Sequence, residues 1–230
     1  MFEFPLLMTE AKSPHQNGYP GLRPSSEVRD GKRIERDVAV SMRDGTILYV
    51  DILRPETEAR VPVLLAYTPY GKHNTIDFQP NLAEGADIDP PLPAGTVFEA
   101  PAAAYWVAHG YAVVYADTRG SWGCEGNATY FSLQEALDGY DLVEWAGTQA
   151  WSNGKVGMSG VSYLALVQYG VAATRPPHLA AITAVWSGES ERGLHAGRGG
   201  AGHPRESSPV HCTLRGIRHR RSAIGAGCRQ

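Results

Sequence analysis

The alternation of apolar and polar residues in the first part of the chain predicts a β-hairpin. Residues 33–42 and residues 46–55 each alternate as half-buried strands do. Between them, Arg43-Asp44-Gly45 supplies a strong turn signal. Residues 1–33 lack this alternation and are rich in Pro, Gly and Ser, which predicts an extended N-terminal arm.

After the hairpin, unbroken apolar runs alternate with segments of helical spacing. Runs typical of strands buried on both faces lie at residues 61–71, 111–120, 155–160 and 179–188. Apolar residues at helical spacing predict helices at residues 101–110, 132–149 and 163–174. Residues 72–100 break every period and are predicted to form a long loop, functional or inserted. This order of elements predicts an α/β fold with a mostly parallel sheet that helices cover on both faces.

Two serines compete for the role of nucleophile where the strand 155–160 meets the helix 163–174. Ser159 and Ser162 each complete the first half of the G-x-S-x-G motif, and each lacks the final glycine. A nucleophilic serine needs a tight strand-to-helix turn, because that turn exposes its hydroxyl and aims backbone N–H groups at the developing oxyanion. The length of the strand places Ser159 inside it or at its end and Ser162 on the turn. Ser162 is therefore the candidate nucleophile, and Ser159 is interpreted as a small packing residue.

Four segments in a fixed order resemble the cocaine esterase and X-Pro dipeptidyl-peptidase family of serine hydrolases. They are residues 36–46 (RDVAVSMRDGT), 61–73 (VPVLLAYTPYGKH), 110–126 (GYAVVYADTRGSWGCEG) and 150–165 (AWSNGKVGMSGVSYLA). The resemblance covers about residues 34–188. It implies an α/β-hydrolase fold whose C-terminal part is missing, and hydrolysis of ester or amide (peptide) bonds as the chemistry.

The resemblance also implies roles for individual residues. In the family the serine lies in G-x-S-Y, which matches Gly160-Val161-Ser162-Tyr163, and the glycine that usually follows three places later is Ala165 here. The implied oxyanion hole pairs the hydroxyl of Tyr70, from the Pro-Tyr dipeptide, with the backbone N–H of Tyr163. Tyr70 ends a buried strand, where ligands of parallel sheets bind. The alternative for Tyr70 is an aromatic lid over the edge of the sheet.

The matching segment from Asp117 to Gly126 is assigned a structural role. Arg119 and Glu125 are predicted to form a bidentate ion pair that fixes the loop after the strand. Asp117 is not expected to be the catalytic acid, because the acid of this fold follows the serine in the chain.

The acid and the base of a catalytic triad are hard to find after Ser162. The fold requires the order serine, acid, histidine, yet the last aspartate of the sequence is Asp141. His178 precedes a strand and is expected at the wrong end of the sheet. The histidines that follow it lie in the final segment: His195, His203, His211 and His219.

That final segment, residues 189–230, differs sharply in composition from the rest. Eight Arg against three Glu give it a charge of +5, and the net charge of −3 then leaves −8 for residues 1–188. It has eight Gly and no aromatic residue, so it is expected to be disordered. Three hypotheses compete: a shifted reading frame, a basic arm that binds nucleic acid or lipid, and a minimal hydrolase with Glu189 as acid and a tail histidine as base. The abrupt onset favours the first.

These observations predict three regions: an N-terminal arm (1–33), a partial hydrolase domain (34–188) and a basic tail (189–230). The expected function is that of a weak or inactive serine hydrolase fragment acting on a small ester or peptide. The alternative is a non-catalytic protein that binds through the tail. No metal or organic cofactor, specific nucleic acid or membrane partner is implied, and Cys124, Cys212 and Cys228 form no zinc or disulfide pattern. Without a signal peptide or an apolar span, a cytoplasmic location is expected.

Overall fold

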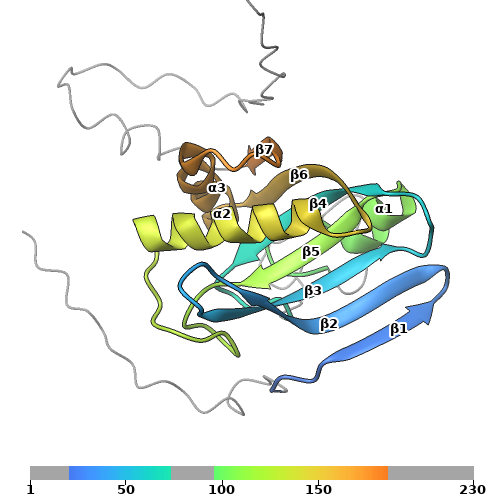
Figure 1. Ribbon diagram of the computed structural model, residues 1–230, viewed down its shortest axis with the longest axis horizontal. Helices are drawn as coiled ribbons and strands as arrows, with labels where there is room; N and C mark the ends of the chain where they lie inside the picture. Colours follow the sequence, from blue (N-terminus) through green and yellow to red (C-terminus); the bar gives the residue numbers. More distant parts are fainter. Residues whose placement is uncertain (1–20, 74–95, 186–230) are drawn as a thin grey trace, which may run out of the picture.

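The computed structural model describes residues 21–73 and 96–185 of the chain, and these form one mixed sheet with helices on both faces (Figure 1). The strands follow the spatial order β1-β2-β3-β5-β4-β6-β7. The strands are β1 (Ser25–Arg29), β2 (Lys32–Ser41), β3 (Ile47–Pro55), β4 (Val61–Thr68), β5 (Ala112–Asp117), β6 (Ser152–Val161) and β7 (Leu179–Val185). The helices are α1 (Ala103–Ala108), α2 (Leu133–Thr148) and α3 (Tyr163–Thr174).

The sheet has an antiparallel half and a parallel half. Strands β1, β2 and β3 pair antiparallel with one another, and β3 also pairs antiparallel with β5. Strands β5, β4, β6 and β7 run parallel, as the unbroken apolar runs predicted. From β4 the chain turns to β5 on one side and then crosses to β6 on the other, so the strand order reverses beside β4. In open α/β sheets such a switch point, at the carboxyl ends of the strands, is where ligands bind.

Two clusters of buried apolar side chains hold the helices to the two faces. On one face, α2 and α3 bring Leu142 and Val171 against β4 and β6, which contribute Leu65 and Met158. On the other face, Val107 of α1 packs together with Ala66 of β4 and with Val113 and Tyr115 of β5. Strands β4 and β5 are therefore buried on both faces, and this explains why their sequences show no alternation. Figure 1 shows α2 lying across one face of the sheet.

The prediction for the N-terminal arm needs a correction, because part of that arm is strand β1 of the sheet. Residues 25–29 form an edge strand that pairs with β2, and Asp30 and Gly31 both adopt positive φ at the hairpin turn between them. All five residues of β1 are exposed, so no side chain had to be apolar and no alternation marked the strand. The Asp-Gly pair was the available signal, because this dipeptide favours two-residue hairpin turns.

The remaining predictions of elements are confirmed within a few residues. The turn at Arg43-Asp44-Gly45 closes with a hydrogen bond from the N–H of Gly45 to the carbonyl of Met42 (2.9 Å). Strand β6 begins at Ser152, three residues earlier than the apolar run indicated. Most of the predicted loop 72–100 lies outside the described residues. In the described ranges no helix is long and apolar enough to cross a membrane.

Candidate active site

Ser162 lies on the turn that joins β6 to α3, where the sequence placed it. Its backbone has φ 54° and ψ −114°, a region that residues other than glycine rarely occupy. The turn is fixed on both sides: the N–H of Ser162 donates to the carbonyl of Val185 (3.1 Å), and the carbonyl of Ser162 accepts from the N–H groups of Ala165 and Leu166 (both 3.0 Å). The serine is thus held in a strained conformation by the first turn of α3 and by the end of β7.

Glycine is required two residues before Ser162. A Cβ atom at Gly160 would lie 2.3 Å from the Cβ of Leu164, which is closer than real carbon atoms approach. Ala165, which replaces the usual glycine of the motif, is fully buried and therefore packs, as expected. Ser159 lies inside β6, paired in register with Thr183 of β7, so the turn belongs to Ser162 and not to Ser159.

Tyr70 follows β4, two residues after the strand ends at Thr68. Because β4 and β6 are parallel neighbours, their carboxyl ends meet at one edge of the sheet, and Tyr70 reaches the turn that carries Ser162. The ring of Tyr70 packs edge-on against the rings of Tyr163 (centroids 6.0 Å apart) and Phe98 (4.9 Å). Burial raises the pKa of the Tyr70 hydroxyl, which keeps it protonated and able to donate near neutral pH.

Tyr163, the first residue of α3, directs its hydroxyl toward α2. Its hydroxyl donates to Oε1 of Glu135 (2.5 Å), a buried carboxylate of α2 that also accepts from the N–H of Phe131 (2.6 Å). Burial and the hydrogen bond to Glu135 raise the pKa of the Tyr163 hydroxyl well above its ordinary value. The hydroxyl of Tyr163 is therefore committed to α2, and only its backbone N–H is suited to an oxyanion.

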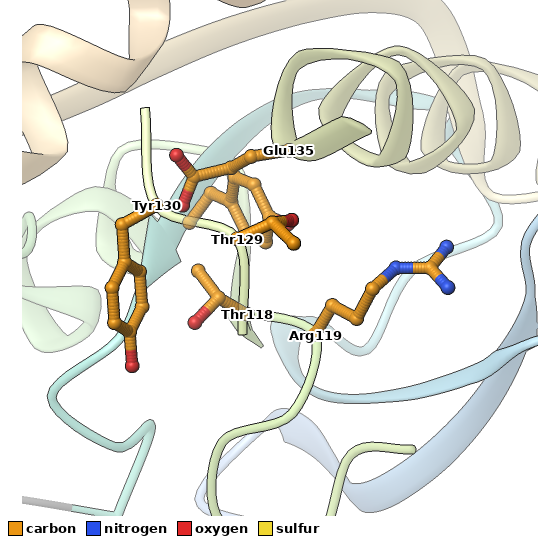
Figure 2. Close-up of a pocket in the computed structure, with 6 residues that line it drawn as sticks. Thr118, Arg119, Thr129, Tyr130 and Glu135 are labelled. Atoms are coloured by element: carbon orange, nitrogen blue, oxygen red, sulfur yellow. The ribbon is translucent and has the colours of Figure 1, made fainter. Parts of the chain in front are cut away.

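A small, shallow pocket lies beside Glu135 (Figure 2). Its lining consists of Tyr67, Thr118, Arg119, Thr129, Tyr130 and Glu135. Figure 2 shows the guanidinium group of Arg119 pointing away from Tyr130 and Glu135. Ser162 does not line this pocket, so the pocket is not the place where a carbonyl would be attacked.

Glu99 is the site residue that sequence reasoning missed. Its carboxyl group lies near the backbone N–H of Tyr163 and the hydroxyl of Ser162. Its own backbone carbonyl accepts from the N–H of Val161 (3.0 Å), and its φ of 58° is again unusual for a non-glycine residue. Burial raises the pKa of Glu99, although its neighbours Tyr163 and Ser162 oppose that change. No pattern around residue 99 indicated this, because the contact joins segments that are distant in sequence.

A buried cluster of charges anchors the segment that carries Tyr70. Lys72, only 4 % exposed, pairs with Asp37 and with Oδ1 of Asp51 (3.1 Å). The backbone N–H of Lys72 donates to Oδ1 of Asp117 (2.6 Å) at the end of β5. Burial raises the pKa of Asp117 to about 7, with Lys72 lowering it and the neighbouring carboxylates raising it further. The structural role predicted for Asp117 agrees with these contacts.

The predicted ion pair between Arg119 and Glu125 is wrong. The guanidinium of Arg119 forms a bidentate pair with the fully buried Asp138 of α2 (2.7 and 2.6 Å) and also contacts Asp44 (2.9 Å). Glu125 instead accepts from the N–H of Ile47 (2.9 Å). Asp138 lies on α2, 19 residues after Arg119, so spacing along the chain did not indicate this pair.

His178 is not placed to act on Ser162. It lies before β7, and its Nδ1 and backbone N–H both contact the carboxylate of Glu144 (2.7 and 2.9 Å). Since β6 and β7 are parallel, this end of β7 is the edge opposite Ser162, as predicted. The other candidates for acid and base, Glu189, His195, His203, His211 and His219, lie outside the described residues, as do Cys212 and Cys228.

Comparison with known proteins defines the class and then the family. Two crystal structures of a CocE/NonD family hydrolase from Staphylococcus aureus are similar, at 38 % and 35 % identity and TM-scores of 0.60 and 0.61. The match covers 67 % and 74 % of this chain but 28 % and 34 % of those chains. The fold is that of the α/β-hydrolases.

The family model for X-Pro dipeptidyl-peptidase (S15 family) matches residues 44–225, a range that extends into the Arg-rich segment. The chain therefore belongs to the X-Pro dipeptidyl-peptidase (S15) family. Cocaine esterase from Rhodococcus sp. (strain MB1 Bresler) is 35 % identical over 169 residues. That alignment covers 73 % of this chain and 26 % of the esterase, so this chain spans about a quarter of its relative's length.

Proposed function

We propose that this chain carries the nucleophile and the oxyanion hole of a serine hydrolase that cleaves ester or amide (peptide) bonds. Ser162 attacks the carbonyl carbon, while the N–H of Tyr163 and the hydroxyl of Tyr70 stabilise the oxygen that becomes negative. The observation that carries the proposal is the conformation of Ser162, with φ 54° and ψ −114° between β6 and α3.

A serine held in a strained conformation at this position supports a functional role for that serine. A non-glycine residue in such a region costs about 1–3 kcal/mol and persists where the surrounding structure enforces it. Here Gly160 and the hydrogen bonds of the turn enforce it. A serine on a sharp turn between a strand and a helix presents its hydroxyl at the edge of the sheet, which is the arrangement of the nucleophile in α/β-hydrolases.

The two proposed oxyanion donors suit their task. Tyr163 opens α3, so its N–H has no partner within the helix and lies at the positive end of the helix dipole. Tyr70 lies at the same edge of the sheet, and the raised pKa of its hydroxyl keeps the proton that it donates. Such donors stabilise a developing charge strongly because they are already oriented before the reaction.

The transfer of the proton from Ser162 is the step that this chain supports least. The sequence has no aspartate after Asp141, and His178 faces Glu144 at the opposite edge of the sheet. Without an adjacent base a serine hydroxyl keeps a high pKa and is a poor nucleophile. We therefore propose that the 230-residue chain by itself is a weak or inactive hydrolase.

Its cytoplasmic location stays a prediction that cell fractionation would check.

The test is covalent labelling of the full chain with a fluorophosphonate, together with hydrolysis of an activated ester. Labelling should reach Ser162 and disappear in Ser162→Ala, while Ser159→Ala, a matched change three residues away, should label like the parent. Slow ester turnover should follow the same order. Labelling that survives Ser162→Ala and disappears in Ser159→Ala would mean that the wrong serine has been chosen. A rapid rate of ester turnover would contradict the proposed weakness of the chain.

A further inference from the structure

Trp122, from the loop after β5, holds the first half of the turn that carries Tyr70. Its indole N–H donates to the carbonyl of Pro69 (2.9 Å), the residue before Tyr70. Gly71, the residue after Tyr70, has φ 100°, and a Cβ atom there would lie 2.9 Å from Cε2 of Trp122. A residue without a side chain therefore lets the indole lie against the backbone of the turn. Because the indole contacts the chain on both sides of Tyr70, it restricts where the phenol ring can lie.

Lys72 holds the other end of the same turn. Its side chain is 4 % exposed, and its ammonium group pairs with the carboxylates of Asp37 and Asp51 (3.1 Å to Oδ1 of Asp51). Its backbone N–H donates to Oδ1 of Asp117 (2.6 Å). One residue, two places after Tyr70, thus connects the turn to β2, β3 and β5.

Strand β2 is irregular where it meets Lys72. Its register with β3 shifts between Glu35 and Val38, and Asp37 in this bulge has φ 51°. The carboxylate of Asp37 also accepts from the backbone N–H of Arg23 (2.6 Å), which fixes its direction. Bulges re-aim a side chain and are frequent beside active sites. Here the bulge directs an acidic side chain to Lys72.

Stability alone does not explain this buried cluster of charges. Taking charges out of water costs about as much as their attraction returns, and well-packed apolar residues in such a place are often at least as stable. A buried ion pair does provide a defined position, because a charge that left its partners would stay unpaired in the interior. A defined position is what an oxyanion donor needs, since its effect depends on its orientation before the reaction.

We propose that Lys72 and Trp122 are positioning residues for Tyr70, which rests on the oxyanion role proposed above for its hydroxyl. They fix the turn, and through it the phenol ring, relative to the turn that carries Ser162. The ring of Tyr70 packs edge-on against that of Tyr163 (centroids 6.0 Å apart), so a shift of its turn changes how it meets the start of α3. The competing interpretation is that Lys72 and Trp122 only stabilise the fold.

A double-mutant cycle with Tyr70→Phe separates positioning from stabilisation. Lys72→Met should slow the fluorophosphonate labelling of Ser162 about tenfold, because the phosphonyl oxygen enters the oxyanion hole and a small misplacement of a catalytic group is costly. In the Tyr70→Phe background the donor is already lost, so Lys72→Met should slow labelling less than about twofold. The loss should fall on the maximal labelling rate and not on the probe concentration that gives half of it. Equal losses in the two backgrounds, or an unchanged rate in the parent, would overturn the proposal.

Two further variants cover the case in which Lys72→Met does not fold, since it leaves two buried carboxylates without their cation. Lys72→Met combined with Asp37→Asn removes one charge of each sign, and asparagine tolerates the positive φ of residue 37. Trp122→Phe removes the donor to Pro69 and leaves the charges intact. Both should slow labelling in the parent and have little effect in Tyr70→Phe. Equal slowing of labelling in both backgrounds would again indicate stabilisation alone.

Arg33→Met is the matched control. It removes a cation of β2 that pairs with Glu56 (2.8 Å) near the surface, far along the strand from the bulge. Its labelling rate should equal that of the parent. A loss as large as that of Lys72→Met would show that removal of any cation near β2 has this effect, and the proposal would fail.

A second measurement does not depend on reactivity. The ring centroids of Tyr70 and Phe98 lie 4.9 Å apart, so an NMR cross-peak joins their ring protons in the parent. The cross-peak should weaken in Lys72→Met and in Trp122→Phe, and an unchanged cross-peak in both would overturn the proposal. If Ser162 is never labelled while the cross-peak weakens, the proposed nucleophile fails and the holding of Tyr70 by these two residues stands.

Discussion

Asp117→Asn should make the protein more stable at alkaline pH than the parent. The Asp117 side chain is 1 % exposed and lies among Lys72, Asp37 and Asp51. Asparagine keeps the size of the side chain and an oxygen that can accept from the backbone N–H of Lys72, the bond that Asp117 makes at 2.6 Å. The substitution therefore removes the titratable carboxyl group and keeps the size and the main hydrogen bond of the side chain.

The sign follows from the pKa of Asp117, which burial raises from 3.8 in the unfolded chain to about 7 in the folded protein. The folded state keeps the proton more tightly, so this group contributes stability that is present below pH 3.8 and lost as the pH rises through 7. At about 1.36 kcal/mol per pH unit, the loss amounts to about 4 kcal/mol. For a domain of this size that corresponds to a difference of about 10 °C in the melting temperature.

The assay is urea denaturation of both proteins at several pH values from 3.5 to 8.5. The two proteins are compared at each pH, because their other titrating groups cancel in the difference. The free energies of unfolding should agree near the acid end and separate progressively, with Asp117→Asn the more stable at pH 8. Asp30→Asn on the exposed hairpin turn makes the same change of charge and should show no such divergence. If Asp117→Asn instead lost stability as the pH rose, Asp117 would be an ionised partner of Lys72, and the reasoning would be wrong.

Three further substitutions and one deletion test other parts of the description. Gly160→Ala should destabilise the fold by about 1–3 kcal/mol, measured by urea denaturation, because its Cβ would overlap the first turn of α3. Tyr70→Phe should reduce ester turnover about 10²-fold with an unchanged fold by circular dichroism, as expected for one lost oxyanion donor; full activity would leave the aromatic-lid interpretation. Arg119→Ala should cost about 3 kcal/mol in thermal unfolding because it strands a buried carboxylate, whereas Arg33→Ala, which breaks an exposed pair, should change little. Deleting residues 189–230 should remove only weak, salt-sensitive binding to polyanions; loss of tight, sequence-selective binding would contradict this.

Much of the site could be predicted from the sequence because it depends on local patterns. The position of Ser162 followed from the length of an apolar run and the start of a helical period, and the turn lies where those patterns meet. Tyr70 was indicated by the family resemblance, and its place just after a buried strand is consistent with the role that the resemblance implies. Parallel strands align their carboxyl ends, so two such ends in adjacent strands specify one edge of the sheet without any knowledge of side-chain contacts.

What the sequence by itself determined is the succession of strands and helices and the turn that carries Ser162, since periodicity and turn residues act over a few positions. Only the tertiary structure decided which charged groups meet: Arg119 with Asp138, and Lys72 with Asp37. Spacing along the chain had suggested Glu125 for Arg119, and no spacing pointed to Glu99. The packing of the sheet determines which segments lie next to one another. A buried charge or carboxyl group has to form hydrogen bonds, so its partner is a donor on whichever segment lies beside it.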